Sequence, residues 1–275
     1  MPVGEKSRSD ELSIRADRIH RIGMRVVRGV MMVMFKSMCL TVLLAFANSA
    51  GISQAQKDLP PMIHDAEQQL EEGRNTLDEQ TLMAARQVFE RCAQERGDRA
   101  RCYYDLGRTD SYMIQAREYN GNRKGALEAL DSGIENARRA VELDENFADA
   151  HALLGDLYGR KIGYGGMLAG MKYGSRAEAE VNRAMQLDSN DPRIYVVEGR
   201  RELYSPKMFG GDIDKAIESF RRSTTINPNY DEGFVWLAIA YDKKGDRDAA
   251  KAAVAEALRL NHRSVFAKKT QASLK

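Results

Sequence analysis

Apolar residues recur every three or four positions along most of the chain after residue 60, which is the spacing of amphipathic helices. The clearest example is residues 231–264, DEGFVWLAIAYDKKGDRDAAKAAVAEALRLNHRS. It holds two apolar stripes, the first made of Phe234, Leu237, Ala238 and Tyr241 and the second of Ala250, Val254 and Ala257. Gly245-Asp246 separates them, and glycine commonly ends a helix. The segment therefore predicts two helices joined by a tight turn.

The same pattern recurs at four places upstream. The second helix of each unit opens on a small residue, and the closing turn follows twelve positions later. The aromatic position of the next first helix then follows that turn by six positions in every case. We predict five helix pairs, at about 61–97, 98–145, 146–189, 192–228 and 231–262, and a carboxyl-terminal capping helix at 263–275. Together they make a single solenoid over residues 56–275.

These motifs resemble the tetratricopeptide repeat, a 34-residue helix–turn–helix unit. The residues that carry the resemblance are Phe234-x2-Leu237-Ala238-x2-Tyr241 with Ala250-x3-Val254, and His151-x2-Leu154-Gly155-x2-Tyr158 with Ala177-x3-Val181. The resemblance implies an all-α fold, a right-handed superhelix. Residues 150–262, with IGYGGMLAGMKYG and SPKMFGGDIDKAIESFRRSTTINP, are also similar to exported bacterial tetratricopeptide repeat proteins of uncharacterised function. That similarity implies fold and export, and no activity.

The turn inside each repeat varies in length, unlike the junction between repeats. Relative to the last repeat, three upstream repeats carry insertions of 14, 10 and 5 residues at this same turn. All three should emerge on one edge of the solenoid. Two interpretations stay open: longer helices that pack on each other, or a roof over one end of the groove. The second predicts an insert pocket for a small molecule, lined by Tyr164, Met167, Met171, Tyr173, Met208 and Phe209.

The concave wall of such a solenoid comes from first-helix positions that lie between the core positions. This pattern selects Arg101, Tyr104, Arg108, Tyr112, Asp156, Arg160, Arg193, Arg200 and Tyr204. Five arginines with three tyrosines suit carboxylates or an extended acidic peptide. Alternatively, these arginines only solvate the groove. We expect a scaffold that binds a protein segment in its concave groove; the alternative is a periplasmic solute-binding protein that uses the insert pocket.

The first 55 residues have the pattern of a leader. Basic residues precede a ten-residue apolar core at 38–47, whereas a membrane span needs about 20 apolar residues. We predict a signal peptide and a periplasmic or secreted protein, with an uncleaved membrane anchor as the alternative. The whole chain has a net charge of +2, but the leader holds eight Lys/Arg and four Asp/Glu, so the remainder is slightly acidic. Nucleic-acid binding therefore has no support from composition.

Motifs for catalysis or cofactor binding are missing from the sequence. Gly165-x4-Gly170 is followed by Met171 where a phosphate-binding loop needs lysine, and the four histidines lack ligand spacing. We expect no enzyme activity, cofactor or metal. Cys92 and Cys102 lie ten residues apart across a repeat junction, which suits either a disulfide or two small buried side chains.

Overall fold

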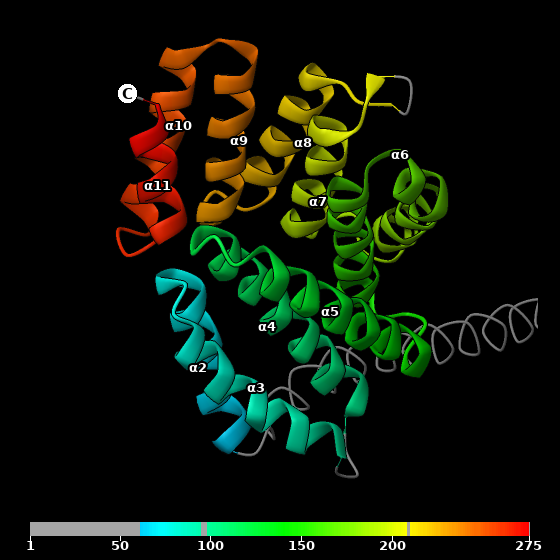
Figure 1. Cartoon of the computed structure of the whole chain (residues 1–275). Helices are drawn as coiled ribbons and strands as arrows, with labels where there is room; N and C mark the ends of the chain where they lie inside the picture. Colours follow the sequence, from blue (N-terminus) through cyan, green and yellow to red (C-terminus); the bar gives the residue numbers. More distant parts are fainter. Residues whose placement is uncertain (1–60, 95–97, 208–209, 275) are drawn as a thin grey trace, which may run out of the picture. The chain divides into compact units, whose positions relative to one another are not determined.

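The structure, a computed structural model, describes residues 61–94, 98–207 and 210–274, and all their regular secondary structure is helical (Figure 1). The predicted leader, with its apolar core, and Met208 and Phe209 lie outside the described residues. The helices are α2 (Pro61–Thr76), α3 (Glu79–Gln94), α4 (Arg99–Tyr119), α5 (Arg123–Leu143), α6 (Ala148–Leu187), α7 (Pro192–Tyr204), α8 (Ile213–Ile226), α9 (Asp231–Lys244), α10 (Arg247–Leu260) and α11 (Val265–Ser273). Of these described helices, none combines the length and apolarity that crossing a membrane requires.

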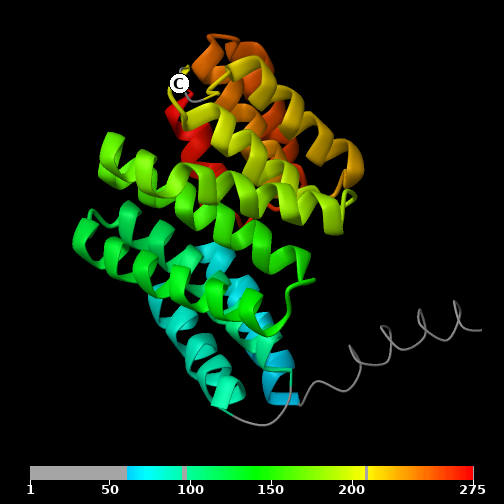
Figure 2. The same ribbon diagram turned by 90° about the vertical axis from the view of Figure 1, so that its right-hand side faces the viewer.

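The helices form pairs that stack in chain order (Figure 2). The pairs are α2/α3, α4/α5, the two halves of α6, α7/α8 and α9/α10, with α11 packed on α9 and α10. From α4 onward, each pair begins five positions after the previous pair ends, and α11 follows α10 at the same interval. This arrangement confirms the all-α solenoid of helix pairs.

Glycine at the crossing of paired helices permits their close approach. A Cβ atom on Gly199 of α7 would lie 2.6 Å from Cε1 of Phe220 in α8, and Phe220 is fully buried. A Cβ on Gly155 would lie 2.8 Å from Cγ2 of Val181 in the other half of α6. Any larger side chain at either position would push the two helices of its repeat apart.

Two of the three insertions are extensions of the helices themselves. Helices α4 and α5 are 21 residues long, against 14 for α9 and α10. Helix α6 covers 40 residues and contains its own reversal at Gly166, whose φ of 63° and ψ of −145° are not helical. The stacked rings of Tyr158 and Tyr173, 5.4 Å apart, show that its two halves lie side by side. The first of the two sequence interpretations, longer packed helices, therefore describes these insertions.

The first and last repeats also touch each other. Arg74 Nη1 of α2 lies 3.1 Å from Asp231 Oδ1 of α9, and Asn261 Nδ2 donates to Asn75 Oδ1 at 2.8 Å. Asn261 Nδ2 also donates to Asp231 Oδ2 at 2.7 Å, while Arg263 pairs with Glu72 of α2. We call this set the closing contact: Glu72, Arg74 and Asn75 on one side, with Asp231, Asn261 and Arg263 on the other. It joins the two ends of the described helical array.

Candidate binding groove

The first helices of four repeats surround a pocket of about 100 Å³. We call it the groove pocket, and its lining includes Tyr104, Arg108, Ser111, Tyr112, Gln115, Asp149, Ala152, Leu153, Asp156, Arg160, Asp191, Arg193, Val196, Val197, Arg200, Tyr230, Glu232 and Trp236. Seven of the nine residues that the repeat pattern selected are among them. The other two, Arg101 and Tyr204, lie outside this lining.

A buried ion-pair triad occupies the wall of the groove pocket. Asp156 of α6 accepts from Nε of Arg160, one helical turn away, at 3.2 Å, and its Oδ1 lies 2.6 Å from Nη1 of Arg200 in α7. The side chains of Asp156, Arg160 and Arg200 are 8%, 15% and 14% exposed. Burial alone would raise the pKa of Asp156, but Arg200 and Arg160 outweigh it and hold this pKa below its usual value. The carboxylate is therefore ionised and the triad carries a net positive charge.

Arg200 is held by a carboxylate and an aromatic face. Its guanidinium carbon lies 4.5 Å from the ring centroid of Trp236, a cation–π distance. Its buried Nε makes no hydrogen bond to any described residue, and burial lowers its pKa. The side chain still stays cationic, because arginine does not deprotonate in proteins.

Arg160 has donors left for a ligand. Only its Nε is engaged, with Asp156, and its two terminal amino groups make no hydrogen bond with a residue of the described ranges. The Tyr112 hydroxyl in the same lining stays protonated at neutral pH, since burial raises its pKa to about 12. The Glu232 carboxylate in the same lining already accepts from Trp236 Nε1 at 3.2 Å and from the Tyr230 hydroxyl at 3.3 Å. The terminal amino groups of Arg160 and the Tyr112 hydroxyl are therefore the donors that could bind a carboxylate ligand.

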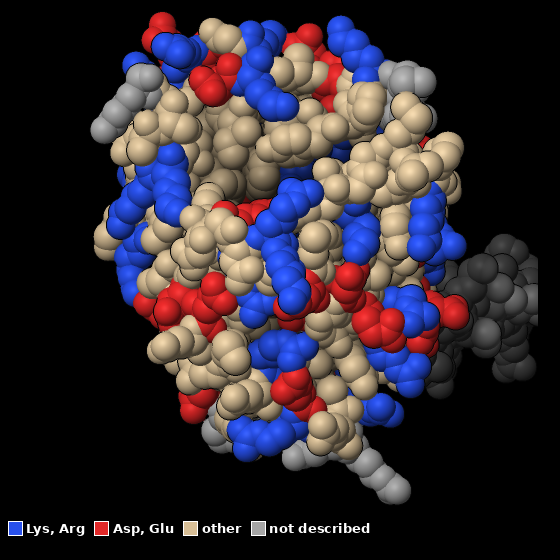
Figure 3. Space-filling model, in the orientation of Figure 1, with Lys and Arg blue, Asp and Glu red and all other residues tan. Residues whose placement is uncertain are grey.

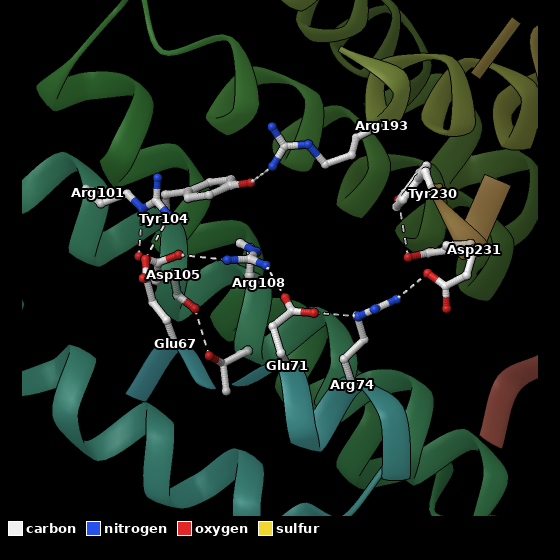
Figure 4. A network of polar contacts seen from close by, with 12 residues as sticks. Glu67, Glu71, Arg74, Arg101, Tyr104, Asp105, Arg108, Arg193, Tyr230 and Asp231 are labelled. Atoms are coloured by element: carbon white, nitrogen blue, oxygen red, sulfur yellow. Dashed lines mark hydrogen bonds and ion pairs between the residues drawn. The ribbon is translucent and has the colours of Figure 1, made fainter. Parts of the chain in front are cut away.

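The remaining groove arginines are already paired; Figure 4 shows Arg108 with Glu71 and Arg193 with the Tyr104 hydroxyl. Arg193 contacts Asp149 through Nη2 at 2.6 Å and donates from Nε to Asp191 at 3.0 Å and from Nη1 to the Tyr104 hydroxyl at 3.1 Å. Arg108 and Arg101 also pair, the former with Asp105 and Glu71 and the latter with Asp105 and Glu67. Arg101, Arg108 and Arg193 thus have two carboxylate partners each, and Arg200 has one partner and an aromatic face. That the groove arginines and tyrosines bind an acidic peptide stays a prediction.

Two carboxyl groups lie together beside Arg193. Burial, together with a hydrogen bond shared with Asp191, raises the pKa of Asp149 to about 6 in spite of the nearby arginine. The pKa of Asp191 is lowered, because hydrogen bonds from Arg193 and Asp149 outweigh its burial. This side of the groove changes charge in the mildly acidic range.

The repeat spacing contains a signal for the residues that the sequence pattern missed. Two positions before the aromatic position, successive first helices carry Arg101, Asp149, Arg193 and Glu232, so the sign of the charge alternates from repeat to repeat. Neighbouring repeats can therefore pair their charges across the groove, as Asp149 and Arg193 do. Acidic and basic side chains are also interspersed over the face in Figure 3. Trp236 and Glu232 would have been found by extending the pattern to the last repeat.

The four described residues of the expected insert pocket lie apart from the groove pocket. Met167 and Met171 are 71% and 67% exposed, because they lie on the α6 extension beyond the packed part of the array. Tyr164 instead donates to Glu118 Oε1 at 2.5 Å, and Tyr173 packs on Tyr158. None of these four expected residues lines the groove pocket, and Met208 and Phe209 are not described.

Other candidate chemistry has structural roles. Cys92 at the end of α3 and Cys102 in α4 form a disulfide, with Cα atoms 5.8 Å apart. His151 is buried between Glu180 and the Glu145 carbonyl oxygen. In the described part of the chain, no group of three His, Cys, Asp or Glu residues could hold a metal ion.

Comparison with known proteins agrees with this geometry. Residues 208–230 and 232–262 match the family model of the tetratricopeptide repeat. The fold is similar to that of a thermophilic tetratricopeptide repeat protein from Thermus thermophilus, with 20% identity, a TM-score of 0.58 and coverage of 76% of this chain and 98% of that one. Pseudomonas aeruginosa pilF aligns at 22% identity with a TM-score of 0.40, over 64% of this chain and 67% of that one. No curated protein sequence matches the chain. Residues 208–262 therefore carry tetratricopeptide repeat sequence, and the described helices have the fold of a tetratricopeptide repeat protein.

Proposed function

We propose that this protein is an exported, non-enzymatic scaffold that binds a segment of a partner protein in its groove. Tetratricopeptide folds generally mediate protein–protein interaction, and stacked helix pairs create the extended concave surfaces used for it. The segment would place a carboxylate against Arg160. Export is supported by the pattern of residues 1–55 and by the Cys92–Cys102 disulfide, since such bonds persist in oxidising compartments.

The observation that carries the proposal is the state of Arg160. It is the groove arginine whose terminal amino groups are unengaged by the described residues. Asp156 pairs with its Nε and is shared with Arg200, and Glu118 and Glu232 lie near enough to raise the pKa of Arg160 further. Aromatic side chains of Tyr112 and Trp236 line the same pocket. A planar guanidinium next to aromatic surface can bind a carboxylate through two hydrogen bonds while the adjoining side chain packs on the rings.

The pocket volume limits what can enter. About 100 Å³ accommodates a side chain rather than a folded domain. A neighbouring stretch of peptide would have to lie along the groove, where paired charges and tyrosines supply specificity more than affinity. The expected ligand is therefore an extended segment with one buried acidic anchor.

The test is capture of partners by the full chain from its own envelope fraction, followed by mass spectrometry of proteins and small molecules. Arg160→Gln should lose most of a captured protein, because Asp156 stays paired with Arg200 while the anchor for the carboxylate is gone. Arg259→Gln on α10 is the matched control; Arg259 is 65% exposed and pairs with Glu256, so capture should be unchanged.

Two results would contradict the proposal. One is equal capture by the Arg160→Gln protein and the wild type when both have the same thermal stability. The other is stoichiometric recovery of a small molecule with no protein partner, which would favour a solute-binding role instead.

A further inference from the structure

The tip of the α6 hairpin exposes three large apolar side chains. Met167, Leu168 and Met171 are 71%, 76% and 67% exposed, more than Met83 at 49% or Leu143 at 41%. Positions 167, 168 and 171 lie on one side of a helix, directly after the reversal at Gly166. We call these three residues the hairpin tip. Contiguous exposed apolar side chains of this kind mark a contact surface in soluble proteins.

Cations follow the hairpin tip along the same side of the helix. Lys172 and Arg176 are four and eight residues beyond Leu168, and both are exposed. With a rise of about 1.5 Å per residue, their Cα atoms lie about 6 and 12 Å behind that of Leu168. Neither makes an ion pair with a described residue; Lys172 Nζ lies 5.0 Å from the ring of Tyr173.

Acidic residues are missing from this part of the sequence. No Asp or Glu occurs between Leu157 and Ala177, whereas Arg160, Lys161, Lys172 and Arg176 do. Arg160 faces the groove and Lys161 pairs with Asp131, so the unpaired charge near the tip belongs to Lys172 and Arg176. Arg123 of α5 adds a third exposed cation, 4.9 Å from the ring of Tyr164.

We propose that the hairpin tip inserts into the surface of a membrane that contains anionic phospholipids. Apolar faces of interfacial helices sink about 5–10 Å into the boundary between headgroups and acyl chains. At that depth of the tip, Lys172 lies at the level of the phosphates, and Arg176 lies in the diffuse field above them. The arrangement of an apolar tip followed by cations matches the polarity of a membrane surface in the same order. This inference does not rest on the groove or its ligand.

A tryptophan introduced at the hairpin tip reports insertion directly. In the full chain, Leu168→Trp should show a blue-shifted emission and at least about twofold quenching on vesicles of brominated phosphatidylcholine and phosphatidylglycerol in equal parts. Met83→Trp on α3 is the matched control and should not be quenched. Because the leader has its own apolar segment, the local quenching is the readout rather than binding of the whole protein. The wild type, with only Trp236, sets the background.

A second experiment tests the role of the cations near the hairpin tip. Quenching of the introduced tryptophan should fall at least about fivefold on vesicles of phosphatidylcholine alone, and equally when Lys172→Glu and Arg176→Glu are added to the Leu168→Trp chain. An unquenched tip tryptophan on the anionic vesicles would overturn the proposal. If a photo-crosslinking residue at position 168 then captured a protein, the surface would belong to a protein partner.

Discussion

Helix α6 carries buried charged side chains in its first half and exposed apolar side chains just after its reversal. At Asp156 and Arg160, charged groups are buried, paired and fixed by neighbours from α7 and α9. Beyond the reversal at Gly166, the hairpin tip exposes apolar side chains and unpaired cations follow it. The two proposals, for the groove and for the hairpin tip, would give one helix two tasks. A fixed, polar wall selects a ligand by geometry, whereas an exposed apolar tip with nearby charge suits a surface without fixed geometry.

The two regions should differ most in how much stability is lost when one carboxylate is removed from each. Asp156→Ala leaves Arg160 and Arg200 buried without their shared partner, which should lower the free energy of unfolding by about 3–5 kcal/mol. Asp131→Ala removes the partner of Lys161 near the hairpin; Asp131 is 64% exposed, so the loss should be about 0–1 kcal/mol. Urea unfolding of both variants measures the difference. Equal losses would mean that the groove pairs do not stabilise the fold.

Replacing one glycine by alanine in each region should give a smaller difference in stability. Gly199→Ala should lower the free energy of unfolding by about 1–3 kcal/mol, because the new Cβ would overlap the ring of Phe220. Gly163→Ala near the hairpin tip has open space around it and should be neutral or stabilise the protein by up to about 1 kcal/mol. Thermal unfolding followed by circular dichroism distinguishes them. If both variants melted alike, the close approach of α7 and α8 would not be required.

The smallest expected effect is a pH dependence confined to the groove. The pKa of Asp149 is about 6 in the folded protein, above its ordinary value of 3.8. A raised pKa means that the stability from this group is full below pH 3.8 and is lost as the pH rises through 6. The loss of stability between pH 4.5 and pH 7.5 should therefore be smaller in Asp149→Asn than in the wild type, by about 1 kcal/mol or 2–4 °C in Tm.

The measurement is Tm at pH 4.5 and pH 7.5 for wild type, Asp149→Asn and a hairpin-tip variant, Met171→Ser. The tip variant should keep the wild-type profile. His151 titrates in the same direction, because its hydrogen bonds to Glu180 and Glu145 outweigh burial and raise its pKa, so only the difference between profiles reports on Asp149. Identical profiles for wild type and Asp149→Asn would show that the carboxyl pair does not share a proton.

The sequence was informative wherever a feature depends on local spacing. The apolar periodicity and the constant junctions predicted the helix pairs, and the same spacing selected seven residues of the groove pocket. The pairing of the groove charges was missed because it depends on how neighbouring repeats rotate against each other, which no single repeat encodes. The exposure of Met167 and Met171 could not be predicted, because an apolar insertion can equally extend a helix beyond its packing partners.

The closing contact has a consequence for how the protein folds. Ordinary repeat arrays have free ends, fray from them and unfold in stages. Here Arg74 and Asp231 join segments 157 positions apart, so the first repeat gains full stability only after the last one is made. This long loop closure should slow folding and make unfolding more cooperative.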